Sequence, residues 1–188
     1  MPAPTTLPTL LRAGLCLCLA LACLPIQGWA APQQGESIPS LQLVAPDRAE
    51  DAAYLGLTGQ QAVTLADFAG ELFLIEIIGV YCPFCHQQVP TFNTLHARLT
   101  RAKLDGAVKM LAIASGATQP EIDFLRQQSG YTYPVLRDED YALHKALGEP
   151  KTPFTMLVDR QGVVRYAHMG IVQDVDGLFA TIKSLLPQ

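Results

Sequence analysis

The chain has 188 residues, of which 49% are hydrophobic and 16% are charged, so it is long and apolar enough to bury a core and is not expected to be disordered. The formal net charge is −4 at pH 7 and no run of basic residues occurs, which gives no indication of a nucleic-acid partner. These properties predict one globular domain.

The first thirty residues are typical of a secretory signal peptide. A single charge, Arg12, precedes a run of about ten apolar residues at positions 15–24, and Gly28-Trp29-Ala30 offers small residues at both positions of a cleavage site. The apolar run is short for a bilayer span, so we expect cleavage after Ala30, with a retained membrane anchor as the alternative. The expected location is therefore the periplasm or an equivalent extracytoplasmic compartment, and loss of Arg12 takes the net charge from −4 to −5.

Cleavage would also change the cysteine chemistry of the chain. Of its five cysteines, those at positions 16, 18 and 23 would leave with the signal peptide, and Cys82 and Cys85 would remain. Disulfides persist outside the cytoplasm, but a bridge between residues three apart closes almost no loop and stabilises a fold little. The spacing therefore favours a redox-active pair over a structural bridge or a metal site.

The first part of the mature chain is predicted to hold only short elements. Residues 31–51 mix proline, glycine, glutamine and acidic residues and are expected to form a linker with an edge strand at Leu41–Val44. The domain itself is expected to cover residues 52–188. Residues 54–58 and 62–65 are predicted to pair as a hairpin.

The rest of the chain alternates between strand and helix patterns. Residues 72–80 form an apolar run without alternation, which is typical of a central strand buried on both faces. A helix from Phe84 to about Lys103, kinked by Pro90, is predicted to follow. Further strands are predicted at 108–114, 133–136, 154–158 and 163–168, and further helices at 119–129, 138–147 and 174–186. This order predicts an α/β fold with a mixed central sheet flanked by helices.

The motif Val80-Tyr81-Cys82-Pro83-Phe84-Cys85-His86 lies where the buried strand gives way to the helix. Cys82 would stand at the start of the helix, facing free N–H groups and the positive end of the helix dipole, and both favour the reactive thiolate. Cys85, one turn further, can attack a mixed disulfide formed at Cys82. We therefore assign Cys82 as the nucleophile and Cys85 as the resolving thiol.

Glu76 is the only charged residue between Leu72 and Cys82. A carboxylate in a buried strand costs several kcal/mol unless it has partners, and a raised pKa is the usual outcome. We expect Glu76 to take the proton from Cys85 during exchange. The alternatives are a half-exposed position at a sheet edge or a pair with a lysine.

Thr152-Pro153 precedes an apolar strand, where proline cannot donate to a β-ladder. A cis Thr152–Pro153 bond would make a tight, fixed turn, whereas a trans proline would begin an edge strand. The residues alone leave both open.

Together these features resemble the thioredoxin superfamily, in particular the exported TlpA/ResA-like thiol-disulfide oxidoreductases, over about Leu65 to Gly170. The positions that carry the resemblance are Leu65-x-Asp67-Phe68-x-Gly70, Glu76 six residues before Cys82, Pro90 five after Cys85, Thr152-Pro153, and Val158-Asp159-x-x-Gly162-x-Val164 followed by Gly170. The resemblance implies a thioredoxin-like fold, here with an N-terminal β extension and an inserted strand and helix. It also implies that Thr152-Pro153 faces the active site, so we expect Thr152 and Pro153, with Tyr81, to shape the substrate-docking groove. The alternative for Tyr81 is an aromatic residue of the core.

The resemblance further implies an enzyme that reduces disulfides in exported cysteine-containing proteins, apocytochrome c among them, with a membrane protein as electron donor. No cofactor beyond the dithiol is implied. The chain departs from the family pattern by Tyr81 in place of tryptophan, by Pro83-Phe84 in place of a proline just before the second cysteine, and by Gln88 in place of glutamate. The Pro-Phe pair is more typical of glutaredoxins and disulfide-forming oxidants, so an oxidant or isomerase is the alternative.

Other classes of protein would explain fewer features of this sequence. Cys82-x-x-Cys85-His86 is also the attachment pattern of c-type haem, with His86 as an axial ligand, but haem accounts for neither Glu76 nor Thr152-Pro153. The four histidines show no spacing of zinc ligands. A peroxiredoxin-type peroxidase would carry threonine where Gly79 stands, and a binding module with a structural Cys82–Cys85 bridge is a further alternative.

Overall fold

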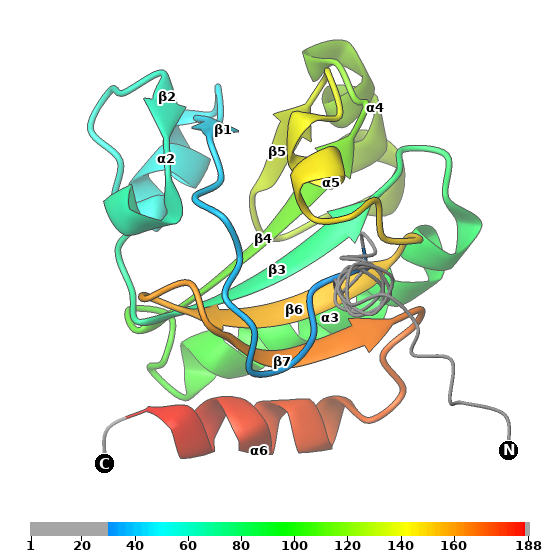
Figure 1. Ribbon diagram of the computed structural model, residues 1–188. Helices are drawn as coiled ribbons and strands as arrows, with labels where there is room; N and C mark the ends of the chain where they lie inside the picture. The colour runs from blue at the N-terminus through cyan, green and yellow to red at the C-terminus, as the bar shows by residue number, and fades with distance from the viewer. Residues whose placement is uncertain (1–29, 187–188) are drawn as a thin grey trace, which may run out of the picture.

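The computed structural model describes residues 30–186, so all of the expected signal peptide except Ala30 lies outside the described residues (Figure 1). The elements in chain order are β1 (Leu43–Val44), α2 (Ala49–Leu55), β2 (Ala62–Val63), the 3-10 helix η1 (Leu65–Asp67), β3 (Leu72–Ile78), α3 (Pro83–Arg101), β4 (Val108–Ser115), α4 (Gln119–Ser129), β5 (Val135–Asp138), α5 (Ala142–Ala146), β6 (Phe154–Asp159), β7 (Val164–Met169) and α6 (Val175–Leu185). Across this part of the chain, no helix combines the length and the apolar character needed to cross a membrane.

The main sheet has five strands in the order β5-β4-β3-β6-β7. Strand β3 pairs in parallel with β4, and β4 does so with β5, whereas β6 runs antiparallel to both β3 and β7. All seven residues of β3 are buried, which confirms the predicted central strand. The mixed sheet flanked by helices is the predicted fold class.

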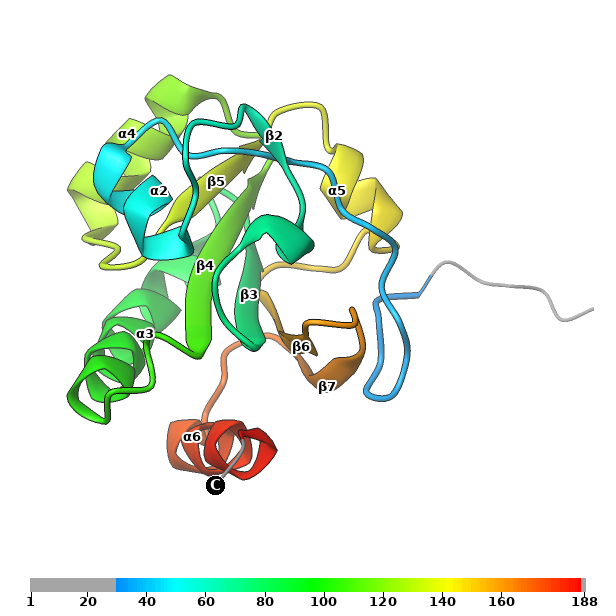
Figure 2. The same cartoon turned by 90° about the vertical axis from the view of Figure 1, so that its left-hand side faces the viewer.

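Two hydrophobic cores fill the two faces of the sheet. On one face α3, α4 and α6 pack against alternate residues of β3 and β4, and on the other face lie α2, α5 and the N-terminal extension. Figure 2 shows α3 and α6 on one side of the sheet and α5 with the extension on the other. Glu76 shares its face of β3 with Leu74 and Ile78, whose side chains belong to the core beneath α3. Helix α3 therefore covers the face of β3 on which Glu76 lies.

Helix α4 and strand β5 form what we call the inserted segment, residues 116–138. Helix α4 has the predicted bounds because its ends carry strong signals. Thr118 and Glu121 form a capping box at its start, and Gly130 ends it in the left-handed conformation with φ of 68°.

The predicted hairpin at 54–65 is wrong. Residues 49–55 form α2, which ends at Gly56 with φ of 78°, and β2 pairs with β1 instead. Alanine-rich residues favour a helix here, although the segment is too short to show a helical period. Helix α2 also crosses the position between residues 51 and 52, where the sequence analysis separates linker from domain.

The predicted start of the helix at Asp138 is also wrong. Asp138 ends β5, and α5 begins only at Ala142. The Asp138 carboxylate still serves that helix, because it accepts hydrogen bonds from the backbone N–H groups of Leu143 and His144 at 3.0 and 2.9 Å. Asp138 is therefore both the last residue of β5 and a capping group of α5.

The N-terminal extension borders both edges of the sheet. Residues 35–38 hydrogen-bond to the start of β7, with backbone N–H to O distances of 2.8 Å between Gly35 and Val164 and 2.9 Å between Ile38 and Gly162. Near the opposite edge, β1 lies beside β5 but pairs with β2 in a separate two-stranded sheet.

Candidate active site

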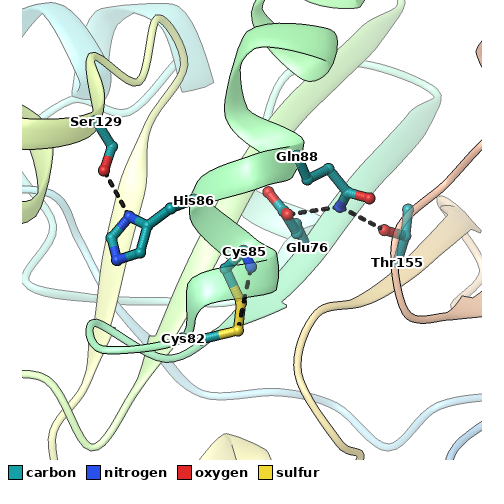
Figure 3. Close-up of a disulfide and its surroundings, with 7 residues drawn as sticks. All are labelled: Glu76, Cys82, Cys85, His86, Gln88, Ser129 and Thr155. Carbon is teal, nitrogen blue, oxygen red and sulfur yellow. Dashed lines mark hydrogen bonds between the residues drawn. A yellow bond between two sulfur atoms is a disulfide. The ribbon is translucent and has the colours of Figure 1, made fainter.

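Cys82 and Cys85 form a disulfide at the first turn of α3, with Cα atoms 5.3 Å apart (Figure 3). Cys82 is the N-cap residue, and its sulfur accepts a hydrogen bond from the backbone N–H of Cys85 at 3.2 Å. Pro83 fits the next position because the first helical residues need no N–H partner. Cys82 is partly exposed and Cys85 only 1% exposed, so an incoming sulfur can reach Cys82 more readily.

Glu76 lies beneath this helix with a side chain that is 1% exposed. Its Oε1 accepts a hydrogen bond from Gln88 Nε2 at 2.7 Å, and its Oε2 accepts one from the Tyr133 hydroxyl at 2.9 Å. The alternatives of a half-exposed edge and of a lysine partner are therefore wrong, because Glu76 is in the central strand and both its partners are neutral.

Burial dominates the electrostatics of Glu76. Loss of solvation raises the pKa of its carboxyl group to about 7, and the hydrogen bonds from Gln88 and Tyr133 act in the opposite direction. A carboxyl group that titrates near neutral pH can both take and give a proton under physiological conditions.

Gln88 connects the acid to two other elements. Its side chain is fully buried on α3; besides bonding Glu76, Nε2 lies 3.4 Å from the Thr155 hydroxyl, and Oε1 accepts the backbone N–H of Val172 at 2.7 Å. Figure 3 shows Glu76, Gln88 and Thr155 on one side of the active-site helix, away from His86. The sequence analysis noted Gln88 only as a departure from the family pattern and missed Tyr133 and Thr155. The position of Gln88, three residues after Cys85 on a helix, is a signal that could have placed it beneath the disulfide.

The Thr152–Pro153 bond is cis. A methyl group on Gly79 would lie 3.6 Å from Cys82 Cβ and 3.8 Å from the Thr152 hydroxyl, so Cys82 and Thr152 border the same small space. The backbone N–H of Gly170 donates to the carbonyl of Pro153 at 2.8 Å, which ties this turn to the end of β7. The sequence-predicted residues Thr152, Cys82 and Cys85 are thus brought together.

Two aromatic side chains beside the disulfide are exposed. Tyr81 is 76% exposed and Phe84 58% exposed, so neither is a core residue. The Tyr81 hydroxyl donates to Glu121 Oε1 at 3.2 Å, and His86 Nδ1 lies 2.7 Å from the Ser129 hydroxyl. The residues flanking the two cysteines therefore contact opposite ends of α4.

The site does not have the shape that a haem requires. A c-type attachment motif opens onto an apolar pocket, whereas here the motif begins a helix that packs on the sheet, and Cys85 is part of the core. Within residues 30–186, no cluster of three or more histidine, cysteine or acidic residues is arranged to hold a metal ion.

Comparison with protein families matches residues 33–182 to the Redoxin family. The chain belongs to the Redoxin family. Similar proteins include the thiol-disulfide oxidoreductase ResA of Geobacillus thermodenitrificans, 24% identical over 112 residues that cover 60% of this chain and 62% of ResA. The thiol:disulfide interchange protein DsbE of Vibrio cholerae is 28% identical over 142 residues, which cover 75% of this chain and 71% of DsbE. The match thus spans about three fifths of that ResA relative's length.

Solved structures agree on the fold. The thioredoxin domain of a thiol-disulfide oxidoreductase from Bacteroides vulgatus superposes with a TM-score of 0.60 at 15% identity, covering 84% of this chain and all of that one. StoA of Bacillus subtilis superposes with a TM-score of 0.59 at 15% identity, covering 78% of this chain and 99% of StoA. This Redoxin chain therefore has the thioredoxin-like fold that the sequence predicts.

Proposed function

We propose that this chain is a thiol-disulfide oxidoreductase that exchanges disulfides with cysteine-containing proteins. The observation that carries the proposal is the disulfide between partly exposed Cys82 and buried Cys85 at the start of α3, because this asymmetry suits a nucleophile and a resolving thiol. The names of the ResA and DsbE relatives describe the same chemistry.

In the reducing direction, the thiolate of Cys82 attacks one sulfur of a substrate disulfide. The substrate S–S bond breaks, one substrate thiolate leaves, and a mixed disulfide joins Cys82 to the substrate. Cys85 then loses its proton and attacks the Cys82 sulfur, which forms the Cys82–Cys85 disulfide and releases the second substrate thiolate. Two electrons pass from the dithiol to the substrate. In the oxidising direction the same steps run in reverse.

Glu76 is the group that takes the Cys85 proton in this scheme. Glu76 lies on the face of β3 whose Leu74 and Ile78 share a core with Cys85, and burial raises the pKa of its carboxyl group to about 7. It can therefore be ionised before the step and protonated after it, near neutral pH.

Tyr81, Thr152 and Pro153 form the substrate-docking groove in our proposal. Thr152 borders the same space as Cys82, and the exposed Tyr81 ring precedes that cysteine. A substrate segment lying against these residues would present its sulfur to Cys82.

We further propose that the protein works outside the cytoplasm after cleavage behind Ala30, as residues 1–30 predict. Apocytochrome c is a substrate that the TlpA/ResA resemblance implies, and a membrane protein would return the electrons. We propose the reductase direction for the same reason, and Pro83-Phe84 is the feature that favours the oxidant alternative.

The reduction potential of the Cys82–Cys85 pair decides the direction of electron flow. Mature protein equilibrated in thiol redox buffers should give a potential of about −250 mV or below if it is a reductant of the thioredoxin type. A potential near about −120 mV would instead assign it to the disulfide-donating oxidants. Absence of any two-electron couple would contradict the proposed function itself.

Two cysteine variants test the assigned roles. Cys82→Ser should abolish exchange, whereas Cys85→Ala should accumulate mixed disulfides, because the substrate can no longer be released by internal attack. Mixed disulfides that accumulate on Cys82→Ser instead would reverse the assignment.

A further inference from the structure

The orientation of the Gln88 amide follows from its neighbours. The backbone N–H of Val172 can only donate, so the Gln88 atom 2.7 Å from it must be the carbonyl oxygen. The amide nitrogen therefore faces Glu76 Oε1, as the 2.7 Å bond requires. An amide nitrogen can only donate, so Oε1 must accept in both protonation states of Glu76.

This constraint leaves one oxygen of Glu76 for the proton. Oε2 faces the hydroxyl of Tyr133 at 2.9 Å. A tyrosine hydroxyl both donates and accepts, so Tyr133 can donate to the carboxylate and, by turning its O–H, accept from the protonated acid. We propose that Tyr133 is the positioning residue that makes Oε2 the oxygen on which Glu76 holds its proton. The proposal rests on the proton role given to Glu76 in the proposed function.

Tyr133 is held in place by contacts independent of Glu76. Its ring packs edge-on against Tyr131 and His96, with centroids 5.4 and 5.9 Å away. Its backbone carbonyl accepts a hydrogen bond from Arg126 Nη1 at 3.2 Å, and the same nitrogen lies 3.0 Å from the carboxylate of Asp51. The inserted segment and α2 together therefore fix the hydroxyl that faces the acid.

The side chains that can influence the titration of Glu76 come from several elements packed around it. Tyr133 and Tyr131 from the inserted segment are the titratable ones, Gln88 and Thr155 are neutral, and Cys85 of α3 carries no titrating thiol while it is in the disulfide. The β4 residue in register with Glu76 is Ala112. Among residues 30–186 no ion pair involves Glu76. Hydrogen bonds and burial thus decide its titration.

Tyr133→Phe tests the proposal, with Tyr131→Phe as the matched control. Both remove one buried hydroxyl and keep the ring, but the Tyr131 hydroxyl has no hydrogen-bond partner among the described residues. The titration of Glu76 is followed by carbon-13 NMR of labelled glutamate carboxyl groups in the oxidised full domain, with Glu76→Gln to assign the signal. The spectra also report whether each variant is folded.

A hydrogen bond to a carboxylate is about twice as strong as one between neutral groups, so losing the Tyr133 hydroxyl disfavours the ionised form more. The Glu76 midpoint should rise by about one pH unit in Tyr133→Phe and move by only about a few tenths in Tyr131→Phe. An unchanged or lowered midpoint in Tyr133→Phe, or equal shifts in the two variants, would overturn the assignment.

The pH profile of disulfide exchange separates this proposal from the one it rests on. If Tyr133→Phe moves both the NMR midpoint of Glu76 and the pH profile of exchange in the same direction, the Tyr133 proposal and the proton role of Glu76 both stand. If Glu76→Gln leaves the exchange profile unchanged while the NMR midpoint still shifts in Tyr133→Phe, the catalytic role of Glu76 fails and the Tyr133 contact stands.

Discussion

Replacing Glu76 by glutamine should make the folded protein more stable at neutral pH, although it removes a proposed catalytic group. The pKa of Glu76 is about 7 in the folded state against an ordinary value of 4.5, because the carboxyl group is buried. Between these two pH values the folded state holds a proton that the unfolded state has released. Stability due to this group is therefore fully present below pH 4.5 and falls as the pH rises to 7.

The size of the effect follows from the same two values. The difference between 4.5 and about 7, at about 1.4 kcal/mol for each pH unit, gives a loss of about 3 kcal/mol. Glutamine does not titrate, and its amide can still accept from Gln88 and donate to the Tyr133 hydroxyl. The free energy of unfolding of the variant, minus that of the wild type, should thus increase by about 3 kcal/mol between pH 4.5 and 7.5.

Urea denaturation of the two oxidised proteins across that pH range measures this difference directly. All other titrating groups are shared by the two proteins and cancel, and equal urea m-values would show that the unfolded states are alike. Parallel stability curves for Glu76→Gln and wild type would refute the reasoning, because they would mean that Glu76 titrates alike in the folded and unfolded states.

Three other substitutions test single contacts. Gln88→Glu places a second carboxyl group beside Glu76, so the two carboxyl groups should share a proton. The upper midpoint in the pH profile of disulfide exchange should then rise by more than about one pH unit. An unchanged pH profile would contradict the contact between residue 88 and Glu76. Asp138→Ala removes the acceptor of two backbone N–H groups at α5 and should lower the free energy of unfolding by about 1–2 kcal/mol in urea, with no loss of redox activity. Gly116→Ala forces a side chain onto a residue with φ of 70° and into the Tyr141 ring. Gly116→Ala should lower the free energy of unfolding by about 1–2 kcal/mol in the same urea assay. The double variant with Tyr141→Ala should regain only the part of this loss that is due to the steric clash. Full recovery of the lost stability would therefore exclude backbone strain at residue 116.

The sequence predicts the elements whose signals are local. The bounds of α4 follow from a capping box at Thr118 and a terminal glycine at Gly130, and the buried β3 follows from an apolar run. Prediction of secondary structure fails where a segment is too short to carry a clear local signal. Residues 49–55 are too few to show a period, and the helix there is settled by packing of Leu55 into the core beneath the sheet.

The candidate active site likewise has residues that local sequence signals identify and residues that only the fold brings together. Cys82, Cys85 and Glu76 can be found from spacing and from a charge in an apolar run. The partner of Glu76 Oε2 cannot be found in this way, because Tyr133 is 57 residues away in sequence and meets the acid only when the inserted segment folds against β3. The state of the Thr152–Pro153 bond was likewise open, since either isomer satisfies the local rules for proline.

The N-terminal extension has a consequence for how the protein behaves at high concentration. A sheet edge with free N–H and C=O groups is a template onto which another chain can add a strand, and this is a common route to aggregation. Residues 35–38 occupy the beginning of the β7 edge, and β1 lies beside β5 at the other. The exposed rings of Tyr81 and Phe84 form a second surface open to other proteins, and in our proposal substrates dock beside Tyr81. Where residues 35–38 hydrogen-bond to the start of β7, that part of the sheet edge is no longer open to strand addition by another chain.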